Sequence, residues 1–354
     1  MKIIPLSGEN LKLLYAKDYL ALTSKNELSV ISSAIHNGGF KKAKAILNVH
    51  VSEEQDMLAL HQNPTKPVLK AIENLELSPE ATVGMITAAD VTKFSLKTME
   101  LNGLRVSAIA TAGCSFAETA GENIEAKVSN NRAGTINIII AIEGNPTESC
   151  MMQNFIAATE AKTAALRELD IRSRYSGDPA TGTVTDSLAI VATNVGPLIR
   201  YGGPASKLGK LVSQCTRSAV KEAALKNGAL SPARSLFQRF CERKIPLNKL
   251  LREILETKIA TINLEELNMK LKATIDKKPF LALVLMMAAK MDEDIKYGLI
   301  PKEFGDLNLL KEEFKTSLHK ALETKATIKN NSSTKDYPFL KSALQCIIEE
   351  ILSK

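Results

Sequence analysis

The sequence predicts an α/β or α+β domain with a mixed sheet over residues 1–228 and an all-α domain over residues 229–354. Three observations lead to this prediction. Sixteen of the 18 glycines lie before residue 229, and glycines supply the turns that strand-rich folds need. In the first part, apolar runs of strand length alternate with amphipathic helical stretches. In the second part, apolar residues recur at helical spacing.

Seven segments of the first domain have the composition of strands. The run Ile136–Ile142 is apolar at almost every position, which predicts a strand buried on both faces. The predicted strands are Tyr19–Thr23, Val30–Ser33, Ala45–Val51, Thr82–Thr87, Val106–Thr111, Thr135–Ile142 and Ser187–Thr193. The predicted helices are Lys66–Leu75, Val91–Leu101, Glu148–Leu169 and Ser206–Lys226. We interpret Asn102-Gly103 and Asn227-Gly228 as helix C-terminal stops, since glycine readily takes positive φ.

Helix start signals divide the second domain. Ser231-Pro232 predicts a cap followed by a first-turn proline, and Asn263 predicts another cap. Pro246 precedes an i, i+3, i+4 stripe, and we expect Pro279 to open the most buried helix. The stripe comprises Leu247, Leu250, Leu251, Ile254 and Leu255. The polar segment Lys325–Asp336 predicts a loop, and Phe339–Leu352 predicts a final amphipathic helix.

Composition argues against several classes of function. The five cysteines are scattered and never form a C-x-x-C pair, so we expect neither a disulfide framework nor a zinc ribbon. We expect the protein to reside in a reducing cytoplasm. The four histidines lack metal-ligand spacing, so we expect no dedicated metal site. The net charge of +7 is spread along the chain rather than gathered in a patch, so we expect no nucleic-acid partner.

Membrane insertion is not expected either. The start, Met1–Pro5, has no long apolar run behind a basic flank, so no signal peptide is predicted. The longest apolar stretch, Phe280–Ala289, is half of the roughly 20 residues that span a bilayer. It predicts a buried helix instead.

Four polar segments interrupt apolar elements and are candidates for chemistry. The paired glycines after Ser32–Asn37 predict exposed backbone N–H groups or a plain turn. On the helix over 148–169, Thr159 and Lys162 interrupt an apolar stripe, while Glu160 and Thr163 share the next one. A buried lysine needs a charge partner, a substrate or a water-filled cleft, unless its ammonium reaches the surface.

The other two segments flank a predicted strand. Thr181, Gly182, Thr183, Thr185 and Asp186 lie at the mouth of the strand Ser187–Thr193, where hydroxyls and amides hold a ligand or simply close a turn. After that strand, Tyr201–Gly203 precedes a helix whose N-terminus suits an anion or an amide oxygen. The same glycines also serve a turn.

Taken together, these segments resemble the adenosylcobinamide amidohydrolase family. The most telling runs are Gly134–Ile139, Ala157–Leu166 and Ala180–Asp186, and the runs Ser32–Gly39, Met85–Asp90 and Tyr201–Gly203 agree with them. The resemblance covers nearly all of residues 20–226. It implies cleavage of the amide that joins aminopropanol to the corrin ring, releasing adenosylcobyric acid for cobamide salvage. The substrate brings its own cobalt, so no cofactor is expected.

The chain departs from the family pattern in one place. Between Thr111 and Gly121, Phe116 and Thr119 stand where the family usually carries an asparagine and an arginine. If that pair contacts substrate, the departure implies a different corrinoid preference or slow turnover. The second domain faintly resembles the helical α-ribazole phosphatase and phosphatidylglycerophosphatase A group over Lys278–Pro301 and Tyr337–Leu352, without its glycine- and aspartate-rich middle. We expect it to be non-catalytic.

Amide hydrolysis needs a base, oxyanion stabilisation and a proton for the departing amine. As a hypothesis, Glu160 or Asp186 is the general base and Lys162 polarises the carbonyl. One of Thr181, Thr183 and Thr185 is instead a covalent nucleophile in the alternative route. The expected substrate-binding residues are Ser33, Asn37, Gly38, Asn137, Thr159, Thr163, Thr181, Gly182, Thr183, Tyr201 and Gly203. The sequence leaves the oligomeric state open.

Two other functions stay open from the sequence. One is a corrinoid-binding protein without catalysis, in which the altered Phe116/Thr119 segment leaves binding intact. The other is a bifunctional enzyme whose helical domain dephosphorylates α-ribazole phosphate.

Overall fold

A computed structural model describes residues 1–7, 10–52, 60, 62–122, 134–228, 234–256, 262–300, 307–322 and 337–352. The chain divides into two compact units, Met1–Arg234 and Ser235–Lys354. The predicted fold class is confirmed, because the first unit holds a mixed sheet with helices and the described elements of the second unit are helical. The expected boundary after residue 228 precedes this division by six residues, and residues 229–233 lie outside the described ranges.

Nine strands of the described chain form one curled sheet. They are β1 (Lys2–Ser7), β2 (Leu11–Tyr15), β3 (Tyr19–Ser32), β4 (Gly39–His50), β5 (Thr82–Thr87), β6 (Ser95–Leu101), β7 (Leu104–Ala112), β9 (Ile136–Glu143) and β12 (Ser187–Ala192). The main path runs β1-β2-β3-β12-β9-β7-β6, and β4 pairs with β3 and β5. The pairs β9–β12 and β4–β5 are parallel and the other pairs are antiparallel.

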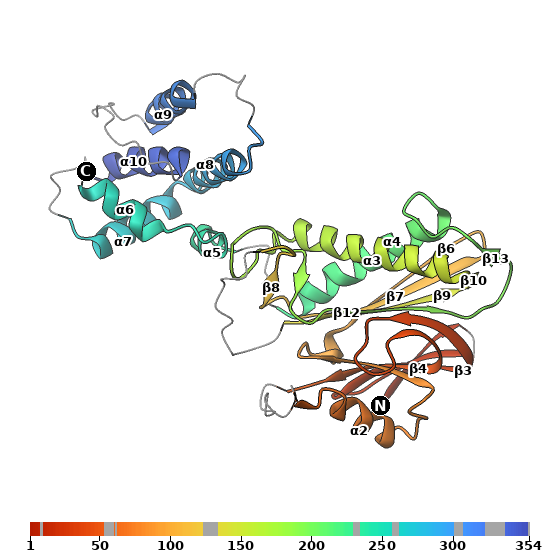
Figure 1. Cartoon of the computed structure of the whole chain (residues 1–354). Coiled ribbons are helices and arrows are strands. Elements are labelled where there is room, and N and C mark those ends of the chain that lie inside the picture. The colour runs from red at the N-terminus through yellow and green to blue at the C-terminus, as the bar shows by residue number, and fades with distance from the viewer. Residues whose placement is uncertain are drawn as a thin grey trace. The chain divides into compact units, whose positions relative to one another are not determined.

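The first unit is built in layers (Figure 1). Helices α3 (Glu148–Glu168) and α4 (Lys207–Lys226) cover the outer face of the β6-β7-β9-β12 part, with alternate strand residues such as Ile138 and Ile140 beneath them. Residues of the opposite parity, such as Ile139, face a second apolar core shared with β3, β4 and β5. Helix α2 (Lys66–Asn74) closes a third, smaller core on β4 and β5. Strand β9 is therefore buried on both faces, as predicted.

One predicted helix is wrong. Residues 91–101 form a short 3-10 turn, η1 (Val91–Lys93), and then the edge strand β6. Asn102 and Gly103 have φ of 52° and 75°, and they join β6 to β7 as a hairpin rather than ending a helix. Positive φ at both central residues is the geometry that Asn-Gly favours in two-residue hairpin turns.

Most other predicted elements are present with shifted ends. The segments Tyr19–Thr23 and Val30–Ser33 belong to one continuous strand, β3, which is interrupted in register between Thr23 and Leu28. Helices α2, α3 and α4 occupy the predicted ranges to within a residue, and Gly228 follows α4 with φ of 70°. Strands β1 and β2 and the two-stranded pairs β8 (Ala117–Glu118) with β11 (Gly182–Thr183) and β10 (Asn145–Pro146) with β13 (Leu198–Ile199) were not predicted.

Arg234 ties the end of the first unit to the C-terminus of α3. Its guanidinium donates to the carbonyl oxygens of Leu169 at 2.7 Å and Asp170 at 3.4 Å. These carbonyls lie just beyond the last turn of α3, where backbone acceptors lack helical partners and favour a cation.

The second unit consists of helices around one apolar core. They are α5 (Leu236–Glu242), α6 (Leu247–Glu256), α7 (Leu264–Lys277), α8 (Phe280–Lys296), α9 (Leu307–Leu322) and α10 (Pro338–Leu352). Asn263 caps α7 through the N–H of Glu266, as predicted, and Ser235 caps α5 with a capping box. The predicted cap at Ser231-Pro232 and loop at 325–336 lie outside the described residues. Within the described ranges, none of the helices combines the length and apolar character needed to cross a bilayer.

Two buried charged residues of this unit make contacts that involve helix α10. Lys341, 4% exposed, pairs with Glu253 of α6 at 2.7 Å. Asp292 of α8 accepts the backbone N–H groups of Phe339 and Leu340, the first turn of α10, at 2.9 and 2.8 Å. Burial raises the pKa of Asp292 to about 6, and the two backbone hydrogen bonds offset only part of that rise.

Candidate active site

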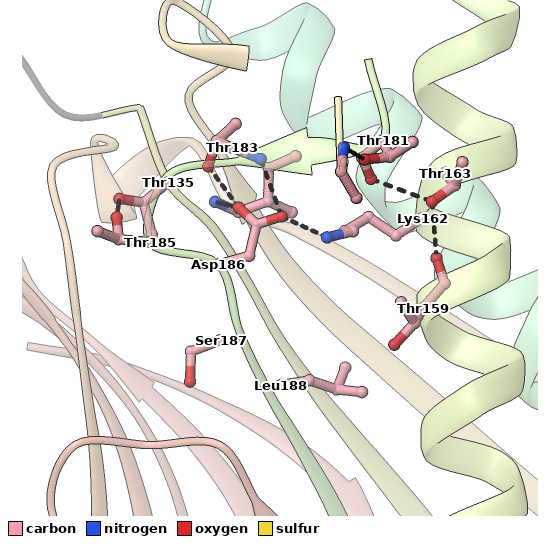
Figure 2. Close-up of polar contacts among 12 residues, drawn as sticks. Thr135, Thr159, Lys162, Thr163, Thr181, Thr183, Thr185, Asp186, Ser187 and Leu188 are labelled. Atoms are coloured by element: carbon pink, nitrogen blue, oxygen red, sulfur yellow. Dashed lines mark hydrogen bonds and ion pairs between the residues drawn. The ribbon is translucent and has the colours of Figure 1, made fainter. Parts of the chain in front are cut away.

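Lys162 and Asp186 form an ion pair at the amino end of β12. The ammonium group contacts Asp186 Oδ2, and the two side chains are 13% and 15% exposed. Figure 2 shows Asp186 between Lys162 of α3 and Thr183 of β11. Lys162 therefore does not escape to the surface. It meets a charge partner, which is one of the outcomes that the sequence left open.

Besides the contact with Lys162, Asp186 accepts three hydrogen bonds from two residues. Its Oδ1 accepts the backbone N–H of Ile136 at 2.9 Å and the hydroxyl of Thr183, and its Oδ2 accepts the Thr183 N–H at 3.1 Å. Because each oxygen accepts two hydrogen bonds, the carboxylate is fixed at the ends of β9, β11 and β12 together.

The pair requires a glycine beside it. A Cβ on Gly182 would lie 2.6 Å from Asp186 Oδ2 and 2.8 Å from Lys162 Nζ. Strand β11 pairs antiparallel with β8, which sets Gly182 opposite Glu118 and Thr183 opposite Ala117. The short β8–β11 ladder therefore presents a bare backbone to the ion pair.

The other predicted threonines bond mainly to one another and to the backbone. Thr185 shares a hydrogen bond with Thr135 at 2.7 Å, and Thr181 accepts the N–H of Ala120 at 2.8 Å. Thr163 donates to Thr181 O at 3.0 Å, which ties α3 to β11 next to Lys162. The hydroxyl of Thr159 donates to Phe155 O at 2.9 Å within α3. Of the threonines in this cluster, Thr183 is the one that donates to a carboxylate (Figure 2).

Asn137 lies at the same end of the sheet, in the interior core. Its amide donates to Asn48 Oδ1 at 2.7 Å and to Ile86 O at 2.8 Å, and its oxygen accepts the Ser187 N–H at 3.1 Å. Asn137 is 1% exposed and its polar groups are all engaged, so it fastens β9 to β4, β5 and β12. The side chain of Ser33 meets that of Ser187 at 3.3 Å.

Three predicted residues lie apart from the ion pair. Glu160 is exposed, and among the described residues it has no hydrogen-bond or salt-bridge partner. Asn37, with φ of 54°, donates to Pro79 O and Thr82 O at 2.8 Å, so its amide closes a loop onto β5. A Cβ on Gly38 would collide with Ala34 O, so this glycine serves the turn.

Tyr201 and Gly203 lie at the opposite end of the β9–β12 pair. Glu143 ends β9, and Gly144 and Thr193 follow β9 and β12; all three line a hollow of about 800 Å³, which Tyr201 also lines. Tyr201 is 73% exposed. The polar segments of the sequence thus divide between two ends of the sheet, with Lys162 and Asp186 at one end and Tyr201 at the other.

The structure adds two side chains that sequence reasoning missed. Cys114 is 6% exposed, and burial together with the negative charge of Asp186 raises the pKa of its thiol to about 12. Arg174 stacks over Phe116, with its guanidinium carbon 4.1 Å from the ring centroid. The place of Arg174 follows from its backbone hydrogen bond to Ala117 in the unpredicted strand β8.

Comparison with known proteins decides the family. The family model for adenosylcobinamide amidohydrolase matches residues 6–232. The chain belongs to this family. The match covers the described amidohydrolase unit almost entirely and includes Lys162, Gly182 and Asp186. It confirms the resemblance drawn from the sequence over residues 20–226.

Relatives add little detail about the amidohydrolase unit. An uncharacterised protein of Methanocaldococcus jannaschii is 28% identical over 225 residues, spanning 58% of this chain and 86% of that protein. A crystal structure of a protein from Pyrococcus horikoshii OT3 covers 63% of this chain and 83% of its own at 11% identity, with a TM-score of 0.31. At that score the likeness supports no statement about fold.

Proposed function

We propose that the first unit hydrolyses the aminopropanol amide of adenosylcobinamide and releases adenosylcobyric acid. Family membership supplies the reaction class. The single structural observation that carries the site is the Lys162–Asp186 pair, which is largely buried beside a glycine and a hydroxyl that donates to the carboxylate. In this proposal the cobalt enters within the corrinoid, so the amide chemistry relies on the protein's side chains.

In the proposed mechanism Lys162 stabilises the oxyanion. One of its three N–H groups points to Asp186, and the other two have no acceptor among the described residues. A preorganised donor of this kind is worth roughly 10²- to 10³-fold in turnover. Asp186 fixes the direction of the ammonium group and keeps it close to Thr183.

Thr183 and Asp186 form the proposed nucleophile and base. The Thr183 hydroxyl donates to Asp186 Oδ1. A nucleophilic hydroxyl is expected to make this contact with the base that accepts its proton. The oxygen attacks the amide carbonyl while its proton passes to Asp186. The same proton then goes to the departing aminopropanol nitrogen, and water hydrolyses the ester that remains.

Single substitutions in the full chain test this assignment. We expect Lys162→Met and Asp186→Asn to lower turnover of adenosylcobinamide by about 10²-fold or more, with adenosylcobyric acid measured by mass spectrometry. Glu160→Gln is the matched control, because Glu160 is exposed on the same helix. Near-native turnover of both Lys162→Met and Asp186→Asn would overturn the site.

The covalent route has its own test. Thr183→Ala removes the nucleophile, whereas Thr183→Ser keeps a hydroxyl at the same place. We expect the alanine variant to lose turnover and the serine variant to keep a measurable part of it. After rapid quenching, the wild-type protein should carry an ester adduct, seen as an increase in its mass by that of the bound corrinoid acyl group. Full activity of Thr183→Ala would leave Asp186 acting on water.

One observation favours a second candidate, corrinoid binding without hydrolysis. The hollow at the Tyr201 end has a volume of about 800 Å³, which is within the range of small-molecule sites, and it lies away from Lys162 and Asp186. Under this candidate, Tyr201→Ala weakens binding of adenosylcobinamide while Lys162→Met leaves binding unchanged and the wild type forms no product. Formation of adenosylcobyric acid by the wild type would exclude it.

The helical unit takes no catalytic part in this proposal. Among its described residues, no group of three His, Cys, Asp or Glu side chains is placed to hold a metal ion, although metal-dependent phosphatases commonly use such groups. We expect the full chain to leave α-ribazole phosphate intact, as measured by phosphate release. Phosphate release from α-ribazole phosphate by the wild type, and its loss in the Asp292→Asn variant, would contradict this expectation.

A further inference from the structure

Arg174 lies in the loop between α3 and β11, and its position is fixed by two contacts. Its backbone N–H donates to Ala117 O of β8 at 2.9 Å, and its guanidinium stacks 4.1 Å above the centroid of the Phe116 ring. The loop is closed by Ser173, whose N–H donates to Asp178 O at 2.8 Å. An arginine stacked on an aromatic ring keeps its planar fork in one orientation.

Among the described residues, the guanidinium of Arg174 has no carboxylate partner. Arg172, two residues earlier, pairs with Asp170 at 2.9 Å, whereas no carboxylate of the described chain lies within ion-pair distance of Arg174. Its Nη1 is shielded from solvent and donates to no acceptor, while the side chain as a whole stays partly exposed. A partly buried cation without a partner is costly, so an acceptor from a ligand is the natural complement.

The backbone of Arg174 is linked to that of Thr183 through strand β8. Ala117, to which Arg174 is bonded, lies opposite Thr183 in the β8–β11 ladder. Two strand spacings place the Arg174 backbone about 10 Å from that of Thr183. Phe116 itself packs closely on Gly134, since a Cβ on Gly134 would lie 2.8 Å from Phe116 N.

We propose that Arg174 binds an oxygen of the corrinoid arm that reacts, and that it discriminates the product carboxylate from the substrate amide. This inference rests on the proposed function. Arg174 Nη1 has no acceptor and Lys162 has one carboxylate partner among the described residues, so both cations can donate to an oxygen that a ligand brings. Phe116, one of the two departures from the family pattern, supplies the ring that holds the guanidinium in place.

The test compares affinity for product with affinity for substrate. For Arg174→Met we expect the inhibition constant of adenosylcobyric acid to rise about 10- to 100-fold, since a hydrogen bond to a charged group is lost. The KM for adenosylcobinamide should rise by only about threefold, because a neutral amide oxygen gains less from the cation. Arg174→Lys should not restore product affinity, because lysine lacks the stacked fork.

Arg167→Met is the matched control. Arg167 is an exposed arginine near the end of α3, and it has no ion-pair partner among the described residues. This variant removes the same charge from the same unit and should leave both constants unchanged. Circular dichroism melting shows whether each variant is folded at the assay temperature, and Arg174→Gln replaces the methionine variant if that one is not.

Direct binding keeps this inference separate from the proposed function. Equilibrium dialysis of adenosylcobyric acid, read by corrinoid absorbance, requires no turnover. Unchanged product affinity in a folded Arg174→Met variant would overturn the role of Arg174 even if the wild type hydrolyses the amide. Absence of hydrolysis by the wild type would overturn the proposed function, while a selective loss of product binding in Arg174→Met would still support the role of Arg174.

Discussion

Lys162 and Asp186 meet in the space that a side chain at Gly182 would occupy. The lysine comes from the middle of α3, and the aspartate precedes β12, so the pair joins the helical layer to the sheet. Gly182 is conformationally ordinary, and its lack of a side chain matters only because of this contact.

Gly182→Ala should therefore separate the pair. The added Cβ would lie 2.6 Å from Asp186 Oδ2, so either the carboxylate or the ladder has to move. We expect turnover of adenosylcobinamide to fall by about 10²-fold, and the free energy of unfolding by about 1–3 kcal/mol. Steady-state kinetics and urea denaturation measure the two effects.

Gly113→Ala is the control for that experiment. A Cβ on Gly113 would have Ala89 Cβ at 3.4 Å as its closest neighbour, an ordinary van der Waals contact. This variant should keep both activity and stability near those of the wild type. Equal losses in the two variants would contradict the steric argument for Gly182.

Asn137→Leu should destabilise the first unit without acting through the ion pair. It leaves Asn48 Oδ1, Ile86 O and the Ser187 N–H without their partner in a buried setting. We expect a loss of about 2–4 kcal/mol in the free energy of unfolding, measured by urea denaturation. Asn145→Leu, which loses one long contact of 3.5 Å to Gly196 O, should lose far less.

Asp292 predicts a pH dependence for the helical unit. Burial raises the pKa of its carboxyl from 3.8 to about 6, so the folded state binds the proton more tightly than the unfolded chain. The stability that this proton contributes is present at low pH, is lost as the pH rises between about 4 and 6, and is gone above that range. The full change amounts to about 3 kcal/mol.

Asp292→Asn should flatten this dependence, because the side chain no longer ionises. The measurement is urea unfolding of both proteins at several pH values between about 4 and 7, with the difference in unfolding free energy as the readout. Asp276→Asn, at an exposed position on α7, controls for the loss of one negative charge. A difference between wild type and Asp292→Asn that does not vary with pH would contradict the raised pKa.

Gly103→Ala tests the hairpin between β6 and β7. Gly103 has φ of 75°, where an alanine Cβ is strained, so we expect a loss of about 1 kcal/mol in the free energy of unfolding. Asn102→Gly, at φ of 52°, should be close to neutral because glycine accepts that conformation. Chemical denaturation of the two variants side by side gives the comparison.

The hairpin also shows where sequence reasoning about the fold went wrong. Asn102-Gly103 fits the C-terminal stop of a helix over Val91–Leu101, but Asn-Gly is also the strongest short-range hairpin signal, and here it forms the hairpin. Strand β6 lies at the sheet edge, so its residues alternate weakly between buried and exposed. Buried β9, in contrast, was predictable because both its faces are apolar.

The candidate site was predictable in part. A lysine inside an apolar helical stripe needs a partner, and an aspartate at a strand mouth is a reasonable one. Glu160 lies on another face of α3 than Lys162, because residues two apart on a helix do not face the same side. Tyr201 follows β12 whereas Asp186 precedes it, so the strand itself separates them, and that separation follows only once β12 is known to be continuous.

The two guanidinium contacts of Arg234 bear on where the gene is best cut to express the first unit alone. A fragment that stops at residue 228 loses the donors that hold the carbonyls of Leu169 and Asp170. One that continues through residue 234 keeps them, together with the natural ending of the helix that carries Lys162.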